Sequence, residues 1–199
     1  MASEEIERDQ RVVHAKRRRQ RLLYSLNDLQ QALSACEFLY ECDEDQTYSK
    51  IDLRRFRCFE TTLVVAYTRP FSQSRGEIPA LTMKMIDLKL SAEKRALHDR
   101  LMQMRNQIMA HSDAEMMRMT TQAFDIPIGD EKPPVFLIQT VFDEGITLLG
   151  PLLVETNTLL RQVFQAIYHA LHEEAQANPE LFNLRIDSDE ARAARNMRV

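Results

Sequence analysis

The sequence predicts an all-α protein, built as an antiparallel four-helix bundle with a β-hairpin inserted between the last two long helices. The composition favours helix over sheet, because only 4 of the 199 residues are glycine and 7 are proline. Apolar residues recur at spacings of three and four through four long segments, which is the pattern of helices that bury one face. One segment after residue 128 instead combines a Gly-Asp-Glu-Lys-Pro-Pro turn with β-branched and aromatic residues, which is typical of a hairpin. Four long helices with one hairpin pack most naturally as an antiparallel bundle.

The first two helices are predicted from their apolar stripes. In the first helix the stripe consists of Leu22, Leu26, Leu29, Leu33 and Cys36. We expect this helix to begin upstream in a charged segment and to end before the acidic turn at 41–45. The second helix is expected from about Tyr48 to Tyr67. It should stop before Pro70, because the residue that precedes a proline is pushed out of helical geometry.

The third helix should follow a short helical piece at 83–88. Ser91 fits an N-cap, since its hydroxyl can accept a backbone N–H and the acidic Glu93 follows in the first turn. The inward stripe of this helix is Leu97, Leu101, Met104, Ile108 and His111. The histidine therefore stands where the pattern expects an apolar side chain.

The hairpin and the last helix complete the predicted fold. The strands are expected at 122–128 and 135–142, on either side of the proline-containing turn. The last helix is expected from about Ile146 to Gln176, with leucine, valine and isoleucine along its inner side.

The predicted organisation is a charged helical extension at 1–21, a helical bundle at 22–177 and a flexible or partner-docked tail at 178–199. The tail alternates acidic residues with arginine and has little apolar content. Within the extension, residues 16–21 form a basic block in a chain whose net charge is −4. That block either steers RNA through its electric field or is a solvated helix surface.

Several classes of site are not predicted. No segment reaches the roughly 18 continuous apolar residues that span a bilayer, and the N-terminus has no apolar signal core, so we expect a cytoplasmic protein. Cys36, Cys42 and Cys58 are odd in number and not closely paired, which predicts neither a disulfide framework nor a zinc site. We expect them to be buried or half-buried. The sequence has no glycine-rich phosphate loop, nucleophile elbow or metal-binding histidine pair, so neither a metal nor a cofactor is predicted.

Residues 105–111, Arg-Asn-Gln-Ile-Met-Ala-His, place an arginine, an amide and a histidine near the end of the third helix. The interval from Arg105 to His111, with the polar Asn106 directly after the arginine, resembles the signature of the HEPN superfamily (higher eukaryotes and prokaryotes nucleotide-binding domain). A second block, at 57–72, resembles one that accompanies the motif in some bacterial members.

The resemblance implies a metal-independent endoribonuclease of the kind found in toxin-antitoxin or phage-defence systems. Its expected partners are RNA, a second copy of the chain and an antitoxin protein. A homodimer would place two copies of the motif across one groove. The resemblance equally allows a non-catalytic HEPN-like helical module that binds a nucleotide, RNA or a protein partner through the same groove.

The residue types of the motif suit RNA cleavage without a metal. Histidine suits the proton transfers because its ordinary pKa is about 6.5, and arginine can donate two hydrogen bonds to phosphate oxygens at once. We therefore assign His111 as general base or acid and Arg105 as the phosphate ligand. Asn106 would orient either of them, although it points away from the apolar stripe, which favours a supporting role. In a straight helix Arg105 and His111 lie about 120° apart and about 9 Å along the axis, so one helix alone does not clamp one phosphate.

Arg69 and His98 are the candidate substrate-binding residues. Arg69 either lines the same groove from the end of the second helix or caps that helix. His98 lies one heptad before Arg105 and either extends a phosphate groove or is a partly exposed surface histidine. The motif also has a purely structural interpretation, in which His111 is a core histidine bonded to a backbone carbonyl and Arg105 pairs with Asp113.

Overall fold

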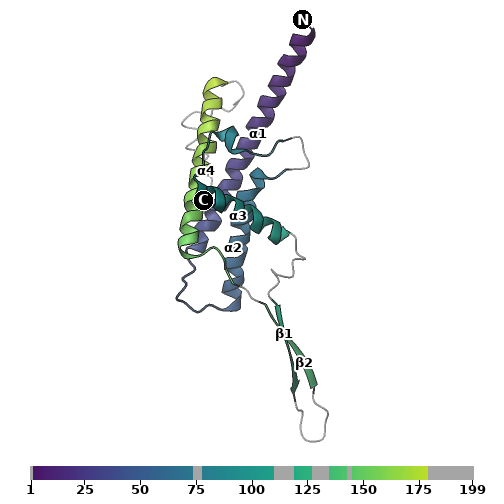
Figure 1. The fold of residues 1–199 in the computed structure, drawn as a ribbon, viewed down its shortest axis with the longest axis vertical. Helices are drawn as coiled ribbons and strands as arrows, with labels where there is room; N and C mark the ends of the chain where they lie inside the picture. Colours follow the sequence, from purple (N-terminus) through teal and green to yellow (C-terminus); the bar gives the residue numbers. More distant parts are fainter. Residues whose placement is uncertain (1, 74–77, 110–118, 127–134, 143–144, 179–199) are drawn as a thin grey trace, which may run out of the picture.

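The computed structural model describes residues 2–73, 78–109, 119–126, 135–142 and 145–178 (Figure 1). The described chain is mostly helical, with one two-stranded sheet, so the all-α prediction with an inserted hairpin is confirmed at this level. The elements in order are α1 (Ala2–Leu39), α2 (Lys50–Thr68), the 3₁₀ helices η1 (Arg69–Phe71) and η2 (Met83–Ile86), α3 (Ala92–Met109), β1 (Met119–Ile126), β2 (Val135–Phe142) and α4 (Gly150–Ala177).

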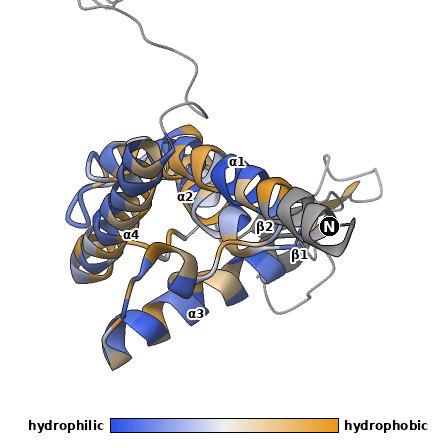
Figure 2. Cartoon of the chain, turned by 90° about the horizontal axis from the view of Figure 1, so that it is seen from above, coloured by the Kyte–Doolittle hydropathy of each residue, from blue (hydrophilic) through white to orange (hydrophobic). Residues whose placement is uncertain are grey.

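Helices α1, α2 and α4 lie lengthwise beside one another, and α3 crosses them (Figures 1 and 2). Ion pairs fix the direction of α4 relative to α1. Arg18, in the first half of α1, contacts Glu174 near the end of α4 at 2.8 Å, whereas Glu37 near the end of α1 contacts Arg161 at 2.8 Å. The two helices therefore run in opposite directions. In Figure 1, α2 also runs opposite to α1.

The core lies where the predicted apolar stripes meet. The ribbons of α1, α2 and α4 alternate hydrophobic and hydrophilic colour along their length in Figure 2, as amphipathic helices do. Leu29 of α1, Leu63 of α2 and Leu160 of α4 are fully buried. Helix α3 contributes Leu101, which is also fully buried. Burial of this apolar surface is the main force that holds the crossing helix against α2 and α4.

Local signals set most of the helix ends. The Ser91 hydroxyl accepts a hydrogen bond from Lys94 N at 3.3 Å, as predicted for an N-cap. Helix α4 begins four residues later than expected, at Gly150. Gly150 has a φ of 50°, a left-handed conformation that glycine adopts without steric cost, and Pro151 follows in the first turn, where its missing N–H is harmless.

A buried carboxylate connects α2 to the segment before α4. Glu60, only 3% exposed, accepts hydrogen bonds from Thr147 N at 2.6 Å and Leu148 N at 2.7 Å through one oxygen. Its second oxygen lies 3.6 Å from Arg57 Nη1. Glu60 thereby holds the chain where it returns from the hairpin into the helical body.

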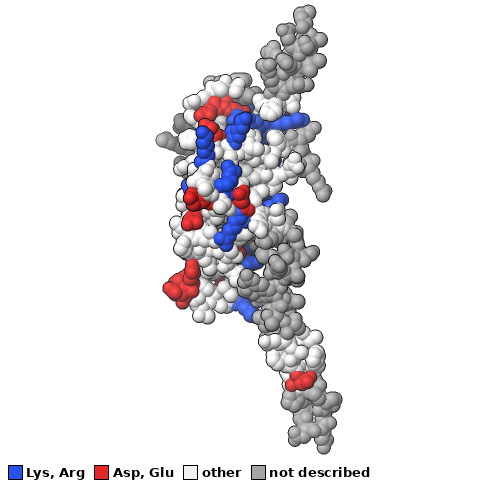
Figure 3. All heavy atoms as spheres, in the orientation of Figure 1, with Lys and Arg blue, Asp and Glu red and all other residues white. Residues whose placement is uncertain are grey.

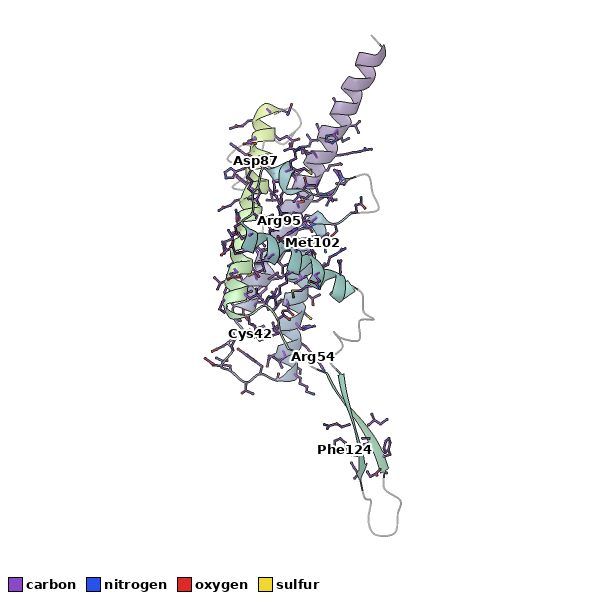
Figure 4. All side chains as sticks on the ribbon, viewed as in Figure 1. Cys42, Arg54, Asp87, Arg95, Met102 and Phe124 are labelled. Atoms are coloured by element: carbon purple, nitrogen blue, oxygen red, sulfur yellow. The ribbon has the colours of Figure 1, made fainter. Side chains whose placement is uncertain are left out.

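The hairpin projects away from the helices (Figure 1), and Phe124 lies far from the helical body in Figure 4. Its strands are antiparallel, with Phe124 opposite Leu137 and Ile126 opposite Val135. These four side chains lie on one face and are all exposed. Strand β1 starts earlier than the predicted residue 122. Asp125 is the only charged residue of the two strands, and the described hairpin in Figure 3 is white apart from one red acidic residue.

Two sequence-based expectations need correction. The basic block at 16–21 is helical but is not simply a solvated surface, because Arg21 is 5% exposed and Arg18 is bonded to Glu174. Cys58 is exposed rather than buried or half-buried.

The predicted tail beyond residue 178 lies outside the described residues. Among the described helices, none is both long and apolar enough to cross a membrane.

Candidate functional site

A cavity of about 480 Å³ lies where α1, the end of α2, η1 and the second half of α3 meet. Its lining residues come from these elements and from both ends of the loop that follows η1: Arg21, Tyr24, Asn27, Asp28, Arg69, Ser72, Gln73, Ile78 and Arg105. Three arginines against one aspartate leave this lining with an excess of positive charge. We call it the arginine cavity.

Arg69 reaches the cavity from the C-terminal end of α2. Its backbone N–H bonds to Val65 O as the C-cap of that helix, and its side chain extends into the cavity lining. There Arg69 Nη1 lies 2.7 Å from Asp28 Oδ1, in an ion pair that joins η1 to α1. The Arg69 side chain remains 55% exposed. Arg69 is thus the C-cap of α2 and also lines the arginine cavity, and its role as a substrate-binding residue stays a prediction.

Arg105 reaches the same cavity from α3 and is half-buried. Within the described part of the chain, its guanidinium forms no ion pair. An arginine that borders a cavity without an internal partner has all five N–H donors available for a ligand. Planar donor pairs of this kind match the geometry of a phosphate or carboxylate.

The Arg21 side chain lines the cavity but is held in place by hydrogen bonds to the loop. Its Nε donates to Pro79 O and its Nη2 to Ile78 O at 3.4 Å, so the guanidinium ties the end of the loop to α1. Burial lowers the pKa of Arg21, an effect that Asp28 partly offsets. Tyr24, which is exposed, adds an aromatic face beside these cations.

Among the predicted site residues that the structure describes, Arg69 and Arg105 come together, whereas Asn106 and His98 lie elsewhere. Arg69 and Arg105 line the same cavity, whereas Asn106 is exposed and outside its lining. His111, together with Asp113 of the structural interpretation, lies outside the described residues. The described residues contain no group of histidine, cysteine and acidic side chains that could hold a metal ion.

His98 lies in the core and not on the surface as expected. It is 9% exposed, and its Nδ1 lies 2.8 Å from the Tyr67 hydroxyl. The Phe71 ring packs edge-on against it, with centroids 4.8 Å apart. Burial lowers the pKa of His98, and Asp99 and Arg95 act in opposite directions on it. His98 does not line the arginine cavity.

From the sequence, Arg21 was noted only as part of the basic block at 16–21, and the other α1 residues of the cavity were not identified. Arg21, Tyr24 and Asp28 are spaced by three and four residues, so they lie along one helix face beside the apolar stripe. This spacing was visible in the sequence. The sequence did not indicate that this face borders a cavity, because Pro79, the partner of Arg21, and Arg69, the partner of Asp28, come from distant segments.

Comparison of the chain with known protein families, with curated proteins and with solved structures found no match. The function proposed below therefore depends on the arginine cavity and on the motif that begins at Arg105, which lines it.

Proposed function

We propose that this protein is a metal-independent endoribonuclease of the HEPN type, in which Arg105 and Arg69 bind the scissile phosphate and His111 transfers protons. The observation that supports the proposal is that Arg69 and Arg105 line one cavity, and that Arg105 has no ion-pair partner among the described residues. A net positive cavity attracts a phosphodiester, and an unpaired arginine can bind it without first breaking an internal bond.

The proposed reaction is transesterification. A base removes the proton from the ribose 2′-hydroxyl, and the 2′-oxygen attacks the phosphorus. The P–O5′ bond then breaks while an acid protonates O5′. The products are a 2′,3′-cyclic phosphate and a 5′-hydroxyl. Arg105 and Arg69 would stabilise the additional negative charge of the phosphorane, which is greatest in the transition state.

Two proton-transfer groups are needed, and one chain contributes a single motif histidine. We propose that the active form is a homodimer in which His111 of each copy faces a shared groove, with Asn106 in a supporting position. We further propose that α1, α2, α3 and α4 together correspond to the four-helix bundle of the family, with α3 inclined across the other three (Figure 1). The proposed setting is a cytoplasmic toxin-antitoxin or phage-defence system, with an antitoxin protein as a regulatory partner.

A second candidate is a non-catalytic HEPN-like module that binds a nucleotide, RNA or a protein partner. One observation favours it: the described lining of the arginine cavity contains arginines that can bind an anion but no histidine. The two candidates share the phosphate-binding arginines. They differ in whether His111 completes the site.

The test incubates purified protein with total RNA and transfer RNA in EDTA and identifies the fragment ends. We expect cleavage to 2′,3′-cyclic phosphate ends by the wild type. Arg105→Ala should reduce the rate roughly 100-fold to 1,000-fold, as loss of one transition-state hydrogen-bond donor does. His111→Ala should abolish cleavage. Arg100→Ala is the matched control, because Arg100 is an exposed arginine on the same helix outside the cavity lining.

Binding without cleavage would favour the second candidate. In that case, folded wild-type protein binds RNA in an Arg105-dependent manner but leaves every RNA intact. Cleavage that survives His111→Ala would contradict the assignment of the histidine.

A further inference from the structure

A second groove, of about 380 Å³, runs between α1 and α2. Its lining consists of polar amide and hydroxyl side chains with two phenylalanines: Asn27, Gln30, Gln31, Ser34, Ala35, Phe38, Phe59 and Thr62. The α1 members recur at spacings of three and four residues, so they form one continuous helix face. We call this the amide groove.

The amide groove lies next to the arginine cavity. Asn27 lines both of them, so the two are neighbours along α1, within reach of one extended ligand. Phe38 lies eleven residues beyond Asn27 on α1, which is about 16 Å at 1.5 Å per residue. This distance is longer than one nucleotide unit of an extended strand, so a neighbouring base can reach Phe38.

The far part of the amide groove presents a stacking surface. The rings of Phe38 and Phe59 stack on each other with centroids 4.8 Å apart and planes inclined at 28°. Phe38 is 46% exposed, so part of its ring remains open to a ligand. Stacking on aromatic rings is the usual way in which proteins bind unpaired bases, and it tolerates any base because every base has a π face.

The remaining side chains suit a nucleic acid strand as well. Asn27, Gln30 and Gln31 carry both donors and acceptors, which base edges require. None of the groove-lining residues is charged, so the groove does not repel a phosphate backbone. The neighbouring Glu37 carboxylate lies 2.8 Å from Arg161, which offsets its charge.

We propose that the amide groove binds the single-stranded continuation of an RNA whose phosphate lies in the arginine cavity, with a base stacked on the Phe38–Phe59 pair. The proposal depends on the proposed function, since it takes the arginine cavity as the phosphate site. It adds a substrate class, unpaired RNA, because bases inside a duplex cannot stack on a protein ring.

The test compares 2′-O-methyl oligouridylates of two and eight nucleotides, in which the blocked 2′-oxygen prevents cleavage. The octamer is titrated by fluorescence anisotropy and the dinucleotide by NMR. Phe38→Leu keeps an apolar side chain and removes the π face. It should weaken octamer binding about fivefold or more, within the range for loss of one base–aromatic stack, and leave dinucleotide binding unchanged. Arg105→Ala should weaken the binding of both ligands.

Two controls sharpen the comparison. Phe136→Leu makes the same substitution at an exposed hairpin position, 61% exposed, and should leave both affinities unchanged. A blunt duplex of eight base pairs should bind more weakly than the single-stranded octamer, and Phe38→Leu should not alter its affinity.

The outcomes separate the two claims. If Arg105→Ala weakens octamer binding and Phe38→Leu leaves it unchanged, the amide groove is not the RNA path, while the arginine cavity remains the phosphate site. If Arg105→Ala changes neither affinity, or if neither oligonucleotide binds, the proposed function and this inference both fail.

Discussion

The Tyr67–His98 contact gives the sharpest test of the core assignment. Tyr67 is fully buried, its hydroxyl lies 2.8 Å from His98 Nδ1, and burial raises its pKa, so the hydroxyl keeps its proton and can donate to the ring nitrogen. Tyr67→Phe removes only this hydroxyl. It leaves a buried nitrogen without its partner, at a cost of about 1–3 kcal/mol of unfolding free energy. For a chain of this length the melting temperature should then fall by about 2–12 °C.

Thermal unfolding followed by circular dichroism measures this effect. Tyr168→Phe is the matched control, since it makes the same change at a residue that is 57% exposed, and it should leave the melting temperature within error of the wild type. RNA binding by folded Tyr67→Phe protein should be unchanged, because neither Tyr67 nor His98 lines the arginine cavity. The reasoning is refuted if Tyr67→Phe melts with the wild type, or if it binds RNA more weakly while still folded.

Two further predictions concern buried ionisable groups. Burial lowers the pKa of His98 in the folded protein below its ordinary value of about 6.5, so as the pH falls the unfolded chain binds a proton at His98 before the folded chain does. The stability that neutral His98 contributes is therefore complete above about pH 6.5. It is lost as the pH falls through the lower pKa of His98 in the folded protein. Melting temperatures measured from pH 7.5 to 5 should therefore fall less steeply for His98→Gln than for the wild type, and parallel curves would contradict this. Glu60→Gln weakens two charge-assisted hydrogen bonds from backbone N–H groups. It should lower the free energy of unfolding, measured by urea denaturation, by about 2 kcal/mol. Glu41→Gln, at an exposed carboxylate, is the control, and an equal loss in both variants would show that burial of Glu60 is not the cause.

The sequence predicted those features that depend on near neighbours along the chain. The Ser91 cap involves residues three positions apart, and the strand pairing follows from residues on either side of one turn. The position of His98 depends instead on Tyr67 and Phe71, which belong to other elements. Helical periodicity placed His98 on a helix face but did not indicate that α3 crosses the other helices, so its burial could not be predicted.

The candidate site shows the same division. The motif indicated Arg105, and the second block indicated Arg69. That the two arginines line one cavity depends on the crossing of α3 over the end of α2. In Figure 4, Arg95 and Met102 mark the path of α3. Tyr24, Asn27 and Asp28 of α1 were missed because each is an ordinary polar or aromatic residue beside an apolar stripe. Only the fold shows that this polar face borders two neighbouring cavities.

Asp28 has two opposing effects on the proposed phosphate site. Its carboxylate lowers the charge of the cavity lining, which weakens the attraction for an anion. It also holds the Arg69 guanidinium through the 2.7 Å ion pair, and an arginine that is already fixed loses less side-chain entropy when a ligand binds. One bond to Asp28 leaves most of the five Arg69 donors available. Because Arg105 lacks such a partner among the described residues, the cavity combines one arginine that is held in place with one that keeps its full charge for the ligand.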